Sequence, residues 1–162
     1  MIKTPYKMGF SLIELLVTIS ILVLLTSLTI PSYRNYQRKT GFDYYSKLIK
    51  NEIQFARSYS LSPPTEHIGF DMFGVTINPT NNTIQKTKKS SETSEVDTIE
   101  SLLSIDNNYR LVTTSNNLYF KVGNNGEIFE SAGGEVVITL TEKNLNQSKT
   151  ITVNQSGLIA IN

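Results

Sequence analysis

Apolar residues fill the beginning of the chain with almost no interruption. The 21 residues from Phe10 to Ile30 contain a single charged side chain, Glu14. A helix of this length spans a hydrocarbon layer roughly 30 Å thick. The preceding segment 1–9 is short and polar, and it carries Lys3 and Lys7. The pattern predicts a membrane-spanning helix close to the N-terminus.

The pattern after this apolar run remains helical but becomes amphipathic. No proline interrupts residues 32–62, and apolar side chains recur there near helical spacing. We predict a continuation of the helix that packs one face on a sheet. The proline pair at residues 63 and 64 is expected to end it. Gly41 is a weak point that favours a bend or an interruption.

Beyond Pro64, short strand-like runs are joined by turns rich in Asn and Gly, as in antiparallel sheets. Strands are predicted at 68–73, 74–77, 109–113, 118–122, 127–129, 135–140, 149–153 and 158–161. Residues 99–103 fit either a strand or a short helix. The polar run Lys86–Asp97 is predicted to be an exposed loop. The expected fold class is therefore α+β.

Glu14 decides between three interpretations of the N-terminus. A carboxylate at the centre of an apolar helix costs roughly 2.5–3.5 kcal/mol on insertion. An ordinary secretory signal needs a small-residue cleavage site, which residues 29–31 match poorly, and a plain signal anchor does not explain the acid. Cleavage between Gly9 and Phe10 would create an amine one turn before Glu14. That amine could neutralise the carboxylate of the same chain or of a neighbour.

Residues 9–17, Gly-Phe-Ser-Leu-Ile-Glu-Leu-Leu-Val, resemble the class III signal of type IV pilins and type II secretion pseudopilins. Pro31 resembles the helix-kinking proline of the same families. The resemblance implies that prepilin peptidase cuts between Gly9 and Phe10 and N-methylates the Phe10 amine. It also implies that Glu14 recruits the subunit into a filament by pairing with a neighbour's N-terminus.

The resemblance further implies a pilin fold, in which a long N-terminal helix packs on antiparallel sheets. The implied division is a cleaved leader (1–9), a transmembrane and filament-core helix (10–31), its amphipathic continuation (32–62) and a β domain (63–162). The implied partners are other pilins or pseudopilins, the peptidase and an inner-membrane assembly platform. The implied location is the bacterial inner membrane, with one span and a periplasmic C-terminal domain, and later the pilus or pseudopilus.

The C-terminal half is similar to minor pseudopilins of the GspH/FimT type in its spacing of strands and glycines, as is the helix segment 54–58. This implies a minor subunit that initiates or caps a filament for secretion, twitching or competence. Some FimT-like proteins bind DNA through an arginine-bearing C-terminal stretch. A DNA-binding minor pilin of a competence pilus is therefore the alternative, although residues 154–162 contain no Lys or Arg.

Charge and composition exclude several other functions. The formal net charge is +1, with 15 basic and 14 acidic residues, which argues against electrostatic capture of nucleic acid. Cysteine is absent and His67 is the only histidine, so no metal site is predicted and His67 is expected on the surface or in packing. The G-x-S-x-G elbow is also missing. We therefore predict no enzyme activity and no cofactor.

Basic residues flank the apolar segment on both sides. Lys3 and Lys7 precede it, and Arg34, Arg38 and Lys39 follow it. The positive-inside rule places the more basic flank in the cytoplasm, so the charge count does not put the N-terminus there. Long domains translocate despite their charge, and the cleavage motif requires a cytoplasmic N-terminus. The predicted orientation follows the motif.

Overall fold

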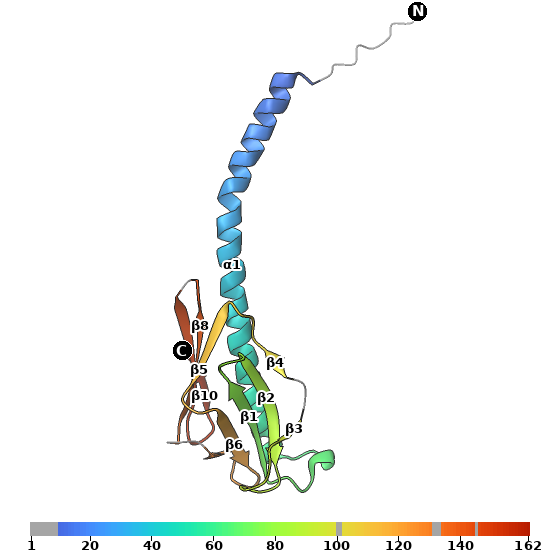
Figure 1. Cartoon of the computed structure of the whole chain (residues 1–162), viewed down its shortest axis with the longest axis vertical. Helices are drawn as coiled ribbons and strands as arrows, with labels where there is room; N and C mark the ends of the chain where they lie inside the picture. The colour runs from blue at the N-terminus through green and yellow to red at the C-terminus, as the bar shows by residue number, and fades with distance from the viewer. Residues whose placement is uncertain (1–9, 100–101, 131–133, 145) are drawn as a thin grey trace, which may run out of the picture. The chain divides into compact units, whose positions relative to one another are not determined.

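The structure is a computed structural model, and it describes residues 10–99, 102–130, 134–144 and 146–162. Helix α1 (Leu12–Leu61) comes first, followed by the short 3-10 helix η1 (Thr65–His67) (Figure 1). The strands are β1 (Met72–Asn78), β2 (Thr83–Lys89), β3 (Asp97–Thr98), β4 (Leu103–Ser104), β5 (Tyr109–Thr113), β6 (Asn117–Lys121), β7 (Ile128–Glu130), β8 (Val136–Glu142), β9 (Gln147–Val153) and β10 (Ile159–Ile161). The chain divides into two compact units between Thr40 and Gly41.

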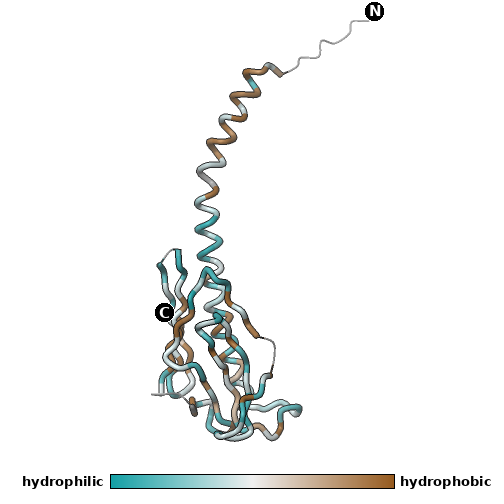
Figure 2. The backbone as a smooth tube through the Cα atoms, in the orientation of Figure 1, coloured by the Kyte–Doolittle hydropathy of each residue, from teal (hydrophilic) through white to brown (hydrophobic). Residues whose placement is uncertain are grey.

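Helix α1 continues through Gly41 and ends at Leu61, two residues before the proline pair. The predicted helix is confirmed, and no interruption occurs at Gly41. Glycine permits close packing there, because an added Cβ would lie 2.5 Å from the Tyr109 hydroxyl oxygen. Figure 2 shows the composition of α1 changing from hydrophobic at its start to more hydrophilic farther along.

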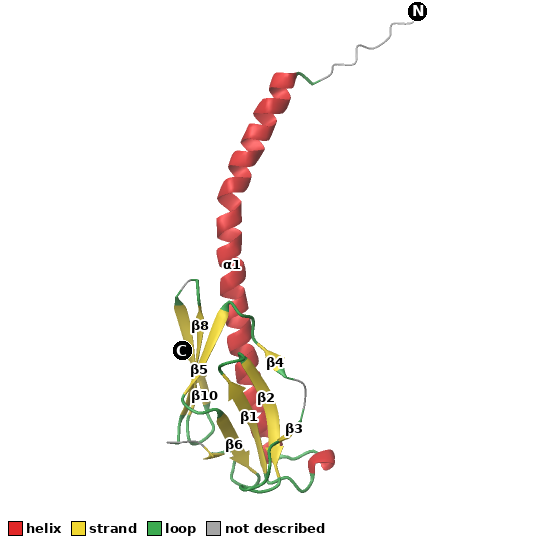
Figure 3. Cartoon of the chain, in the orientation of Figure 1, coloured by secondary structure: helices red, strands yellow, loops and turns green. Residues whose placement is uncertain are grey.

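The described strands form two antiparallel sheets (Figure 3). The first has the order β3-β2-β1-β6-β7, with β4 also pairing with β2, and the second has the order β10-β9-β8-β5. The turns use the predicted Asn and Gly chemistry: φ is 51° at Asn82, 50° at Asn125 and 74° at Gly157. These positive values suit residues that reach the left-handed region at low cost. The α+β prediction is confirmed.

A single apolar cluster joins the C-terminal part of α1 to both sheets. The helix contributes Phe42, Ile49, Ile53 and Ala56, which recur at spacings that place them on one face. The sheets contribute alternate residues, as the burial pattern of β8 illustrates. The buried sheet residues include Val75, Ile77, Leu111, Leu118, Phe120, Val136, Ile138, Leu140, Ile151 and Val153.

The two strands predicted at 68–73 and 74–77 are a single strand, β1, in the structure. Ile68 does not begin a strand, because it is 75 % exposed and β1 starts only at Met72. Of the ambiguous segment 99–103, residues 100 and 101 lie outside the described part of the chain, and Leu103 belongs to β4. The six later strands match their predicted positions within two residues at either end.

The lysines predicted to lie in an exposed loop form the end of β2, and Asp97 belongs to β3. Lys86 and Lys89 are each only 8 % exposed. The Lys86 ammonium lies 3.4 Å from Glu52 Oε2 and 4.2 Å from the centre of the Phe55 ring. The loop prediction failed here because a lysine buries its apolar stem while its ammonium finds a carboxylate or a ring.

Asn82 links the turn after β1 to the edge of the second sheet. Its side-chain amide donates to the Tyr109 carbonyl oxygen at 3.0 Å, and its carbonyl oxygen accepts from the Leu111 N–H at 3.1 Å. One buried side chain therefore satisfies two backbone groups on β5, the edge strand of the second sheet. Because unpaired buried groups are costly, this residue stabilises the junction between the sheets.

We expect Asn82→Ala to lower the free energy of unfolding by about 3 kcal/mol, because it removes two buried hydrogen bonds and a residue suited to positive φ. Asn125→Ala is the control, since Asn125 is exposed and has nearly the same φ, at 50° against 51°. The control should lose only about 1 kcal/mol. Urea unfolding of the full chain in mild detergent measures both, and equal losses would contradict the role of the side-chain amide.

Candidate functional site

The start of α1 is stabilised by a reciprocal pair of hydrogen bonds. The Glu14 N–H donates to Ser11 Oγ at 3.2 Å, and the Ser11 N–H donates to Glu14 Oε2 at 3.1 Å. This is a capping box, in which Ser at the cap and Glu three residues later satisfy two free N–H groups. The sequence analysis missed it, although Ser-x-x-Glu before an apolar run was the available signal. Glu14 therefore caps its own helix in the isolated chain.

Of the other predicted site residues, Phe10 lies beside this capping box and Pro31 lies much farther along the helix. Phe10 precedes the capping box and is 83 % exposed. Gly9, on the other side of the predicted cleavage, lies outside the described residues. Pro31 is inside α1. The structure brings Glu14 together with Ser11, which was not among the predicted site residues.

The first part of α1 presents an apolar surface. From Phe10 to Leu25, the large apolar side chains are between 49 % and 83 % exposed. Exposed apolar surface of this extent requires lipid or other protein segments to cover it. Within the described residues, α1 is the one helix long and apolar enough to cross a membrane.

Several hydroxyl groups in this apolar segment form hydrogen bonds within the helix, and Glu14 is the one charged residue of the segment. Four hydroxyls of the described residues each donate to a backbone carbonyl three or four residues earlier, so they add little to the cost of an apolar environment. The bonds are Thr18 to Leu15 at 2.9 Å, Ser20 to Leu16 at 2.8 Å, Thr26 to Leu22 at 2.9 Å and Ser27 to Leu24 at 2.8 Å.

In the second unit, Arg57 of α1 holds two distant turns. Its Nε donates to the Gly126 carbonyl oxygen at 3.0 Å, and its Nη2 donates to the Ser156 carbonyl oxygen at 3.3 Å. These acceptors lie 69 and 99 residues away along the chain. Gly157 packs so closely that an added Cβ would lie 2.0 Å from the Gly126 oxygen. We call these residues the Arg57 clamp. No local signal in the sequence could have identified its acceptors.

The lysines of β2 and β6 offer little free charge to a nucleic acid. Lys88 Nζ lies 3.6 Å from Asp97 Oδ2, and Lys121 Nζ lies 3.3 Å from Glu92 Oε1. Each ammonium also lies over an aromatic ring, at 4.0 Å for Lys88 and 4.4 Å for Lys121. Because phosphate contacts dominate affinity for DNA, these paired lysines make a poor DNA surface.

His67 packs among aromatic side chains. Its ring centre lies 5.8 Å from that of Tyr59, 6.4 Å from that of Phe70 and 6.2 Å from that of Phe73. The described residues contain no group of three or more His, Cys, Asp or Glu side chains that could hold a metal ion. The position of His67 agrees with the expected packing role.

Comparisons with known proteins find similarity at the level of the fold. No family model and no curated protein matches the chain. The minor pseudopilin EpsH from the type 2 secretion system of Vibrio cholerae matches with a TM-score of 0.57 at 9 % identity, over 75 % of this chain and 95 % of that one. The type IV minor pilin FimU of Pseudomonas aeruginosa matches with a TM-score of 0.59 at 10 % identity, over 78 % of this chain and 92 % of that one.

One of these similar structures is a minor pseudopilin and the other is a type IV minor pilin. The long N-terminal helix and the antiparallel sheets correspond to the predicted architecture. The chain therefore has the α+β fold of the type IV pilins and pseudopilins.

Proposed function

We propose that the chain is a minor pilin or pseudopilin, a structural subunit that enters a filament through its N-terminal helix. The observation that carries this proposal is the exposed apolar start of α1 with one carboxylate, Glu14, on a chain with the pilin fold. An apolar helix surface is covered by lipid before assembly and by the helices of other subunits afterwards. The same surface thus holds the subunit in the membrane before assembly and contacts other subunits after it.

Processing at the N-terminus prepares the helix for assembly. Prepilin peptidase cuts between Gly9 and Phe10 and methylates the new amine, which stays positively charged. A carboxylate accepts several donors, so the bond from the Ser11 N–H leaves Glu14 able to accept a neighbour's Phe10 ammonium. Pairing in a water-poor helix bundle is strong and directional, and it sets the axial register between subunits.

The parts of the chain have separate roles in this proposal. Residues 1–9 are the leader, and residues 10–31 span the inner membrane and later join the filament core, with Pro31 bending the helix. Residues 32–62 support the β domain, 63–162, on the periplasmic side. An inner-membrane assembly platform moves the subunit out of the membrane.

A minor role, of the GspH/FimT type, is supported by the fold similarity to two minor subunits. One is a minor pseudopilin of a type 2 secretion system and the other is a type IV minor pilin. We propose that this chain likewise initiates or caps a filament of a secretion or pilus machine. The Arg57 clamp provides a rigid base for the end of the β domain in that position.

The first test is the N-terminus of the mature chain in cells that contain the prepilin peptidase. Mass spectrometry should find a chain that begins at Phe10 and is one methyl group heavier than the unmodified product. The matched control is Gly9→Leu, which should remain uncut and unmethylated because it removes the glycine of the proposed cleavage motif. A wild-type chain that still begins at Met1 in functional filaments would contradict the proposal.

A further inference from the structure

A belt of aromatic and basic residues follows the apolar part of α1. It consists of Tyr33, Arg34, Tyr36, Arg38 and Lys39, and we call it the basic belt. Tyr33 is 61 % exposed and Tyr36 is 69 % exposed, and Arg34 and Lys39 are also exposed. Tyrosine is enriched where a membrane meets water, because its ring is apolar and its hydroxyl is polar. The composition and exposure of the belt match that boundary.

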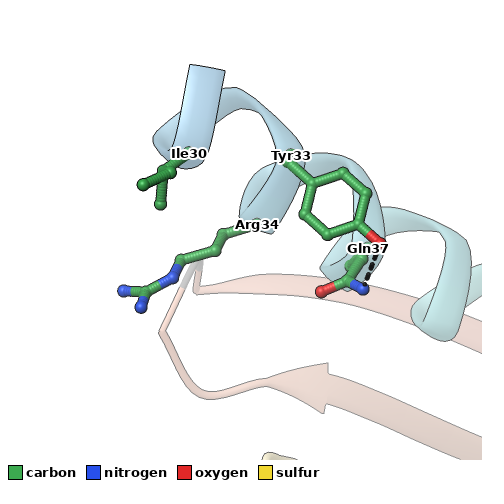
Figure 4. A pocket seen from close by; sticks show the side chains of 4 residues that line it. All are labelled: Ile30, Tyr33, Arg34 and Gln37. Atoms are coloured by element: carbon green, nitrogen blue, oxygen red, sulfur yellow. Dashed lines mark hydrogen bonds between the residues drawn. The ribbon is translucent and has the colours of Figure 1, made fainter. Parts of the chain in front are cut away.

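One face of the belt forms an open groove of about 440 Å³ lined by Ile30, Tyr33, Arg34 and Gln37. These positions are three or four residues apart, and Figure 4 shows their side chains projecting from adjacent turns. Gln37 Nε2 donates to the Tyr33 hydroxyl at 2.9 Å. The groove therefore combines an apolar side chain, an amphipathic ring and a guanidinium, in that order along the helix.

The spacing along α1 places the belt at the far membrane boundary if Phe10 lies at the near one. At a rise of 1.5 Å per residue, Tyr33 is roughly 35 Å beyond Phe10, slightly more than the thickness of the hydrocarbon layer. Arg and Lys side chains at this depth extend their charges into the headgroups while their stems remain in apolar surroundings. Apolar and charged parts of the groove thus face the matching layers of a bilayer.

The charge of the belt is unexpected in the proposed orientation. Translocated flanks of a membrane span are usually poor in Lys and Arg, yet this flank carries three such residues. A basic cluster beside a span is the chemistry that binds anionic headgroups. Arginine in particular forms paired hydrogen bonds with phosphate oxygens.

We propose that the basic belt binds anionic phospholipid headgroups, of the phosphatidylglycerol type, and so holds the waiting subunit at a defined depth in the membrane. This inference rests on the membrane location in the proposed function but not on filament assembly. Arg34 and Lys39 supply charge to the lipid phosphates, and Tyr33 and Tyr36 lie at the level of the glycerol groups.

The test measures lipid selectivity of the full chain by native mass spectrometry in mild detergent, with phosphatidylglycerol and phosphatidylcholine added in equal amounts. The wild-type chain should retain phosphatidylglycerol preferentially. The double variant Arg34→Gln/Lys39→Gln should lower the apparent affinity for phosphatidylglycerol by about thirtyfold, because two cations beside the headgroups are removed. Its affinity for phosphatidylcholine should be almost unchanged.

The matched control is Lys47→Gln/Lys50→Gln, which removes the same charge farther along α1 and should retain the selectivity. Equal binding of both lipids by the wild-type chain, or an equal loss in the control, would overturn the proposal. So would a belt variant that keeps its selectivity and loses only assembly, since the belt would then contact a neighbouring subunit. Glu14→Gln separates the two proposals, because that chain should fail to assemble and still select phosphatidylglycerol.

Discussion

Replacement of Glu14 by Gln should leave membrane insertion and cleavage intact and reduce incorporation into filaments by at least tenfold. Gln is also a good partner in a capping box, so the bond from the Ser11 N–H is kept and only the charge is lost. Insertion becomes easier, because a carboxylate within an apolar span carries an insertion cost that uncharged Gln lowers. A neighbour's Phe10 ammonium then has no acid to neutralise it. The measurement is the amount of subunit in sheared filaments divided by the amount that remains in the membranes.

The control for this result is Ser11→Ala, which removes the other half of the capping box and keeps the carboxylate. It should weaken the first turn of α1 by about 1 kcal/mol and still allow incorporation. If Ser11→Ala and Glu14→Gln abolish incorporation equally, the capped helix start is what assembly requires, and the charge pairing is wrong. Normal incorporation of Glu14→Gln would contradict the mechanism directly.

The largest effect on stability is expected for Gly157→Ala, which should lower the free energy of unfolding by about 4 kcal/mol. The added Cβ would lie 2.0 Å from the Gly126 carbonyl oxygen and 2.7 Å from Arg57 Nε. Relief of these contacts requires the two turns to separate, which breaks the hydrogen bond from Arg57 Nε to the Gly126 oxygen. The backbone at Gly157 also has φ of 74°, which alanine disfavours.

Gly123→Ala separates the cost of the close contacts from the cost of the positive φ. Gly123 has φ of 81°, close to that of Gly157, but an added Cβ there meets no atom within 4 Å. Gly123→Ala should therefore lower the free energy of unfolding by about 1–2 kcal/mol, the cost of the backbone conformation alone. Denaturant unfolding of the full chain in detergent, followed by the tyrosine signals, measures both variants. Similar losses of unfolding free energy in the two variants would show that the Arg57 clamp accommodates the extra methyl group without a large cost.

Much of the fold follows from local patterns. The strand Tyr109–Thr113 was predicted with its observed bounds, because its side chains alternate between the core and solvent. The end of α1 was predictable from a proline pair, which cannot continue a helix. An apolar segment long enough to cross a membrane, and the acid within it, can also be read directly from the sequence.

The failed loop prediction at β2 has a cause that lies outside the local pattern. β2 contains four lysine or glutamine side chains among its seven residues, and no apolar alternation identifies it as a strand. It is held by partners that folding supplies, such as Glu52 and Phe55 beneath Lys86. A lysine that is solvated in the unfolded chain can become a buried strand residue when a ring or a carboxylate is in place beside its ammonium.

The apolar helix, the position of Glu14, the capping motif and the Asn and Gly turns are written in short stretches of sequence, because each depends on groups within one or two turns of chain. The pairing of Asn82 with β5 and the Arg57 clamp depend on partners 27 to 99 residues away. Hydrogen-bonding groups of this kind gain their acceptors only after burial has brought the segments together. Tertiary structure therefore decided how the two sheets and the helix are joined.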